Sequence, residues 1–240
     1  MKRITRLLRI SMFLLVVIGV AMVIRRILAI AGIGGSFNPP AGSRFGGAGK
    51  AAAAVSPGGA SFDAEFARHS SLTLLHIIPG ALFLLLGPWQ FMSRIRNRYP
   101  RFHRRSGLLV IGCGYIIGLS ALVLPFVLRP IGGLNEAAAT TFFALYFLLA
   151  LTMAWRKALQ KEFAAHRRWM IRMFSTGLAV ATIRPIIALF FAFSGQPPQV
   201  FFGTAFWIGF TLHLILAEAW INYTRDRLPN NKFAGNEAHA

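Results

Sequence analysis

The sequence predicts an all-α fold, a bundle of six transmembrane helices, and three observations support this. Only 14% of the 240 residues are charged and 55% are hydrophobic, whereas ordinary soluble domains carry about 25% charged residues. Several apolar runs approach the length of about 20 residues that a helix needs to cross a bilayer. These runs are continuously apolar and lack the alternation of barrel strands, which favours helices.

The first element is a basic segment followed by an apolar run, which Arg25 and Arg26 interrupt. A cleaved signal peptide also begins with basic residues and an apolar stretch. The arginine pair fits poorly between an apolar core and a cleavage site. We therefore predict a retained helix over about 8–31, within a first domain of residues 1–31, while cleavage stays the alternative.

Residues 32–68 are rich in Gly and Ala, a composition that favours a flexible linker, which we expect on the extracytoplasmic side. The membrane core is predicted over 69–225, and residues 226–240 form a polar cytoplasmic tail. Gly114 and Gly118 form a small-xxx-small face, which allows close helix contact. The five spans of the core are predicted at 69–91, 106–128, 137–155, 169–192 and 200–222.

The charge distribution predicts the orientation of the bundle. The net charge is +19, and most of the 26 Lys and Arg residues fall in segments that six spans place on the side of the N-terminus. Cytoplasmic loops of membrane proteins carry such an excess. We therefore expect both termini in the cytoplasm. The same bias accounts for the basic composition without a nucleic-acid partner, and leaves the bilayer and its anionic headgroups as expected partners.

Among the ionisable residues in the predicted spans, four stand out: His76, Arg184, His213 and Glu218. Such residues are rare at membrane depth and mark functional hypotheses. At 1.5 Å of rise per residue, His76 and Arg184 both lie roughly 10–12 Å from the outer face. His213 and Glu218 lie in the inner half. We expect His213 to make a helix–helix hydrogen bond and Glu218 to pair with an inner arginine such as Arg168 or Arg172.

His76 shares one helix face with Gly80 and Gly87, which would give room for a flat ring such as haem or quinone. The alternative is that the two glycines admit a neighbouring helix to which His76 bonds. Arg184 precedes Pro185, which frees a carbonyl one turn back. Arg184 could therefore bind an anionic ligand or bond such carbonyls.

Two similar elements precede apolar runs on the predicted cytoplasmic side, His103-Arg104-Arg105 and His166-Arg167-Arg168. Helix N-termini attract anions, and these side chains add to that attraction. Their spacing suggests a parallel repeat that relates helices two and three to helices four and five. Three uses compete: lipid headgroup binding, binding of an anionic small molecule or quinone, and haem b with His103 and His166 as axial ligands.

Several motifs together carry a family resemblance. They are His76-x-x-Pro79-Gly80, Gly87-Pro88-Trp89-Gln90-Phe91, His103-Arg104-Arg105-x-Gly107 and His166-Arg167-Arg168-Trp169-Met170-Ile171-Arg172, with Arg184 downstream. Over about 69–225 the chain resembles a bacterial family of membrane proteins, the domain of unknown function numbered twenty-three-oh-six. The resemblance implies multi-pass helices in a bacterial inner membrane. It implies no established activity and singles out His76, His103, His166, Arg172 and Arg184.

The functional prediction follows from these candidates. The leading hypothesis is a multi-pass membrane protein that binds an anionic lipid or a small ligand in the bundle. The alternatives are a redox protein that binds haem b or quinone through His103 and His166 or through His76, and a small-solute transporter. The sequence holds none of the common hydrolase or nucleotide-binding motifs, so it assigns no enzyme activity.

Overall fold

The computed structural model describes residues 2–33 and 66–225, and every long element in these ranges is an α-helix. The predicted tail 226–240 and most of the predicted linker lie outside the described residues. Six of the helices are long and apolar enough to cross a membrane, which confirms the predicted fold class. The helices are α1 (Lys2–Ile30), α4 (Ser70–Gln90), α5 (Ser93–Arg98), α6 (Pro100–Val127), α7 (Gly133–Leu159), α8 (Phe163–Phe193) and α9 (Pro198–Arg225).

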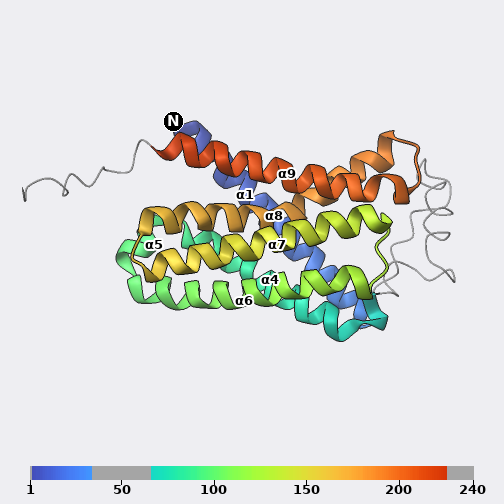
Figure 1. Cartoon of the computed structure of the whole chain (residues 1–240), viewed down its shortest axis with the longest axis horizontal. Helices are drawn as coiled ribbons and strands as arrows, with labels where there is room; N and C mark the ends of the chain where they lie inside the picture. The colour runs from blue at the N-terminus through green and yellow to red at the C-terminus, as the bar shows by residue number, and fades with distance from the viewer. Residues whose placement is uncertain (1, 34–65, 226–240) are drawn as a thin grey trace, which may run out of the picture.

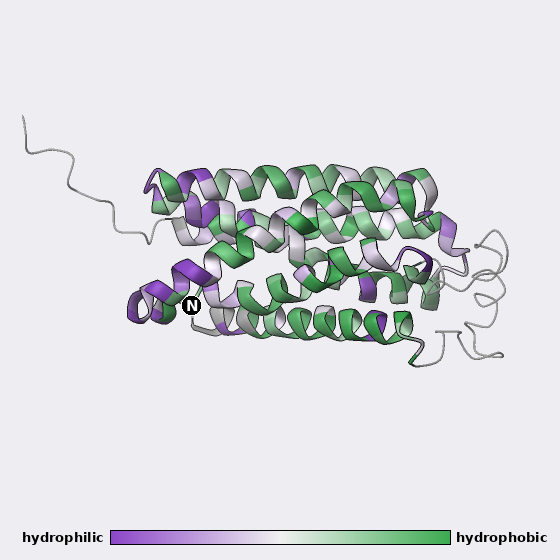
Figure 2. Cartoon of the chain, turned by 90° about the horizontal axis from the view of Figure 1, so that it is seen from below, coloured by the Kyte–Doolittle hydropathy of each residue, from purple (hydrophilic) through white to green (hydrophobic). Residues whose placement is uncertain are grey.

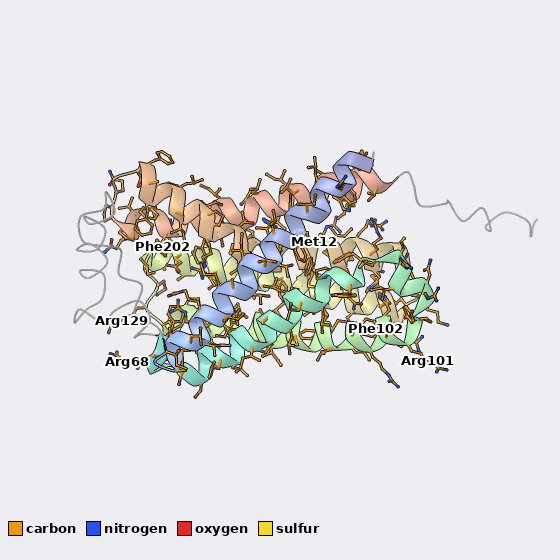
Figure 3. The ribbon with its side chains drawn as sticks, turned by 180° about the vertical axis from the view of Figure 1, so that it is seen from behind. Met12, Arg68, Arg101, Phe102, Arg129 and Phe202 are labelled. Carbon is orange, nitrogen blue, oxygen red and sulfur yellow. The ribbon has the colours of Figure 1, made fainter. Side chains whose placement is uncertain are left out.

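Four helices, α4, α6, α7 and α8, form the central bundle (Figure 1). Each of the pairs α4–α6, α6–α7 and α7–α8 packs along its length, whereas α4 and α8 touch only briefly. Helices α6 and α8 are therefore one of the two diagonal pairs. Helix α9 covers α7 and α8, and α1 crosses obliquely over α4 and α8, as Figure 3 shows from behind. The α4–α8 seam thus lies beneath α1.

The close packing of α6 on α7 depends on glycine. A Cβ at Gly118 would lie 2.5 Å from Leu148, and one at Gly114 would lie 3.0 Å from Leu151. Both leucines belong to α7. These contacts confirm the predicted small-residue face, because only a missing side chain permits this approach.

Helices α6 and α8 begin earlier than predicted. Helix α6 starts at Pro100 and α8 starts at Phe163, so both His-Arg-Arg elements lie inside the first two turns. The prediction that these helices begin just after the elements is wrong. Proline at the first helical position is pre-organised for the helix, and hydropathy marks where a helix enters the bilayer, which differs from where it begins. The α4–α6 and α7–α8 pairs pack side by side, and the repeat that would relate them stays a prediction.

Candidate ligand site at the basic end of the bundle

One end of the bundle gathers α5, the starts of α6 and α8 and the turn after α7, and Figure 2 shows the hydrophilic stretches there. Arg101 and Phe102 mark this end in Figure 3, opposite Arg68 and Arg129. We call it the basic end, defined by Arg94, Arg96, Arg98, Arg101, Arg104, Arg105, Arg156, Lys157, Lys161, Arg167 and Arg168. Its histidines are His103 and His166, each the fourth residue of its helix.

A tight turn fixes the position of His166. Lys161 adopts a left-handed conformation with φ 60°, and the Lys157 ammonium lies 2.9 Å from the Glu162 carboxylate. Helix α8 then folds back along α7, which brings His166 Nδ1 to 2.8 Å from the carbonyl oxygen of Ala154. A carbonyl only accepts hydrogen bonds, so Nδ1 carries the proton and donates it. A neutral His166 therefore keeps its lone pair on Nε2.

His103 has no such partner. Its Nδ1 is buried and makes no hydrogen bond, and it is the single buried side-chain nitrogen or oxygen of this kind in residues 2–33 and 66–225. An unpaired buried polar group costs about 1–3 kcal/mol. The ring lies close enough to Arg96 and His166 for their charges to act on it. The two histidines lie on the diagonal helices α6 and α8, and the charge of His166 acts on His103.

The end of α4 is hydrogen-bonded to the start of α6, next to His103 in the sequence. Gln90 donates from Nε2 to Ser106 Oγ at 2.8 Å, and Ser106 donates to the carbonyl of Phe102 at 2.7 Å. A Cβ at Gly107 would lie only 3.1 Å from Gln90 Oε1, so glycine leaves room for this amide. Both Gln90 and Ser106 are buried. The link holds the start of α6 against the end of α4 and fixes the backbone that carries His103.

The predicted arginines divide into two groups. Arg104 and Arg105 are exposed and Arg168 is half-buried, and all three are available to an anion at the surface. Arg167 donates a hydrogen bond from Nη1 to Thr224 Oγ1 at 3.2 Å. The charge of Arg96 also acts on the Arg167 guanidinium. These side chains surround the two histidines with positive charge.

Arg172 forms an ion pair with Glu218. Its Nε and Nη2 lie 2.5 and 2.9 Å from the two carboxylate oxygens of Glu218, and its guanidinium lies 4.7 Å from the ring centroid of Trp169. This two-bond geometry is the strong form of an arginine–carboxylate pair. It confirms the predicted pairing of Glu218. The pair connects α8 to α9 through the side chain of Arg172.

His213 also behaves as predicted. It is 5% exposed, its Nε2 lies 2.7 Å from Thr182 Oγ1, and its backbone carbonyl accepts a 2.8 Å hydrogen bond from Ser175. Both partners belong to α8. His213 is therefore a helix–helix contact between α9 and α8.

His76 bonds to the neighbouring helix α6. Its Nδ1 lies 2.8 Å from Ser120 Oγ, and that hydroxyl donates to the carbonyl of Ile116 at 2.6 Å. Since the hydroxyl proton is used, His76 Nδ1 is the donor. A Cβ at Gly80 would meet nothing within 4 Å, so Gly80 does not admit a helix.

Arg184 lies on the exposed surface of α8, where the charges of Glu136 and Arg25 act on it. Among the described residues, no hydrogen bond or ion pair joins Arg184 to His76, although the sequence placed them at similar depth. The structure thus leaves His76 and Arg184 in separate surroundings, whereas the charge of His166 acts on His103.

The comparisons with known proteins agree with this architecture. A model of a family of predicted membrane proteins, DUF2306, matches residues 73–221. The chain belongs to this family. The match spans α4 to α9, and so includes both histidines of the basic end. No curated protein and no solved structure matched the chain. Within the described ranges, no three His, Cys, Asp or Glu side chains gather as a metal site.

Sequence reasoning missed three residues of this site. Gln90 and Ser106 lie within or beside the family motifs, and a buried amide at the end of a span could have drawn attention to them. Arg96 shares the short helix α5 (Ser93–Arg98) with Arg94 and Arg98, and only the action of its charge on His103 distinguishes it from them. The Ala154 carbonyl carries no sequence signal, because every residue has one.

Proposed function

We propose that this membrane protein binds an anionic ligand at the basic end of its bundle, between α4, α6 and α8. The ligand presents a phosphate or carboxylate group, from an acidic lipid headgroup or from a small free anion. One observation carries the proposal: the buried, unpartnered Nδ1 of His103 beside His166 and Arg96. A buried imidazole nitrogen without a hydrogen-bond partner indicates a ligand site, and the positive charge around it favours a ligand that carries negative charge.

The local charge balance supports an anion. The basic end is defined by eleven Lys and Arg side chains, and the carboxylate of Glu162 pairs with one of them, Lys157. A hydrogen bond to a charged group contributes about 1.5–3 kcal/mol. Loss of one such contact should therefore weaken binding roughly 10- to 100-fold.

The proposal includes an orientation. Spans that alternate in direction place the basic end on one side of the membrane, and the positive-inside rule makes this side cytoplasmic. In a bacterial inner membrane, the site would face the cytoplasm and the headgroups of the inner leaflet. Acidic lipids attract basic clusters there.

Two measurements distinguish the sources of the anion. Mass spectrometry of lipids that co-purify with the protein in mild detergent detects a bound headgroup. Thermal unfolding with added inorganic phosphate or citrate detects a small anion. We expect enrichment of acidic lipid or stabilisation by the added anion, and loss of either effect when Arg104, Arg105, Arg167 and Arg168 are all replaced by Gln.

The matched control removes the same charge from the same end, by replacement of Arg94, Arg98, Arg101 and Arg156 with Gln. A bound ligand at the histidines should survive this change. Equal losses in both variants would reduce the effect to a general attraction of lipid to a basic surface. An absence of both lipid enrichment and anion stabilisation in the wild-type protein would contradict the proposal.

A further inference from the structure

We propose that His103 and His166 are the axial ligands of a haem-type metalloporphyrin bound at the basic end. This inference rests on the proposed function and names its ligand, because the two propionates of haem make it an anion. It requires two imidazoles that face one interior, each with a lone pair available, and cations at the rim.

The hydrogen bond of His166 leaves one ring nitrogen with a lone pair available. Its Nδ1–H donates to the Ala154 carbonyl at 2.8 Å, which leaves the lone pair on Nε2. Metal-bound histidines characteristically donate their other N–H to a carbonyl or carboxylate, which fixes the tautomer and the ring plane. In His166 the ring nitrogen that would not bind the metal makes the hydrogen bond that is typical of a metal-bound histidine.

His103 supplies the opposite imidazole. Its buried Nδ1 has no hydrogen-bond partner, and either ring nitrogen of a neutral histidine can bind a metal. Each histidine is the fourth residue of its helix, on the diagonal helices α6 and α8. Equal depth on diagonal helices is the arrangement that a six-coordinate iron between two helices needs.

Both histidines lie on interior helix faces. Val110 is seven residues after His103, and Met170 is four residues after His166, so each shares the face of its histidine. Val110 and Met170 are both buried in the same hydrophobic cluster. Phe91 and Trp169 pack against that cluster and could cover an apolar ring.

The number of ligands favours a porphyrin over a bare metal ion. The described residues contain no group of three or more His, Cys, Asp or Glu side chains placed to hold an ion, and two histidines alone leave most coordination positions of an ion unfilled. A porphyrin brings four nitrogens of its own and needs only two axial ligands. The charge of Arg96 acts on both His103 and Arg167, and we assign these two arginines to the propionates.

The test uses the full-length protein, expressed in cells with ample haem, and also titrated with hemin after purification. We expect a Soret band and the spectrum of a low-spin iron with two histidine ligands. Replacement of either His103 or His166 by Ala should weaken hemin binding at least about tenfold. The control variant His69→Ala removes a histidine at the opposite end of the bundle and should keep the spectrum.

A second pair of variants separates ligation from folding. His103→Gly and His166→Gly should bind hemin poorly, and free imidazole in the buffer should restore the two-histidine spectrum. A merely structural histidine would give no such spectral rescue. Hemin binding that is absent in the wild type, or that persists unchanged in both Ala variants, would overturn the inference. If acidic lipid still depends on the four arginines, the proposed function survives that result.

Discussion

The replacement Gly87→Ala should destabilise the bundle, because Gly87 lies where α4 meets α8. A Cβ there would collide with the ring of Phe174. That ring is 4% exposed and sits between Phe83 and Phe91, with centroid distances of 5.5 and 5.4 Å. It has little room to move. Overpacking costs about 1–3 kcal/mol, offset by the helical preference of Ala over Gly of about 0.5–1 kcal/mol.

The net loss is therefore about 1–2 kcal/mol, which corresponds to a Tm lower by roughly 2–8 °C for a chain of this size. Gly80→Ala is the matched control, two turns away in the same helix, where a Cβ meets nothing within 4 Å. Its Tm should rise by about 1–4 °C. The assay is thermal unfolding in detergent, followed by circular dichroism. Equal shifts in the two variants would refute the steric argument.

Three further predictions concern other contacts. Because Arg172 and Glu218 bind each other through two hydrogen bonds, their single Ala variants and the double variant should be non-additive in thermal unfolding, and additive losses would contradict the pair. Cysteine at Arg101 should react with a membrane-impermeant maleimide only from the cytoplasmic side, and cysteine at Arg129 only from the other side, since the sole native cysteine is buried. Reversed labelling would invert the proposed orientation. His213→Ala should cost about 1–3 kcal/mol of stability, because it leaves hydroxyl partners unpaired, without loss of hemin or lipid; a selective loss of ligand would contradict its structural role.

Hydropathy predicted the fold well because lipid imposes a simple rule. A helix in hydrocarbon must be apolar for about 20 residues, and each predicted span lies within or close to one of the six helices. The helix starts were less predictable. Pro100 and Phe163 lie outside the apolar runs, where capping and the adjoining turn decide where a helix begins. The short helix α5 has no hydrophobic pattern from which it could be predicted.

For the polar residues, too, some features were predictable from the sequence and others were not. Depth along a helix predicted that His103 and His166 share a level, and that Glu218 would find an inner arginine. Depth alone could not show which way a side chain points around the helix axis. The sequence placed Arg184 and His76 at one level, yet His76 bonds to Ser120 of α6, whereas the charges of Glu136 and Arg25 act on Arg184. Rotation about the axis depends on packing among all the helices.

Native mass spectrometry of the purified protein tests the central claim most directly, because it weighs the chain together with what remains bound to it. The account predicts one anionic ligand per 26.4 kDa chain, with occupancy that falls in His103→Ala and in His166→Ala and persists in His69→Ala. A wild-type protein that carries no ligand, even after incubation with acidic lipid, phosphate and hemin, would contradict it. So would a ligand whose occupancy is the same in all three variants.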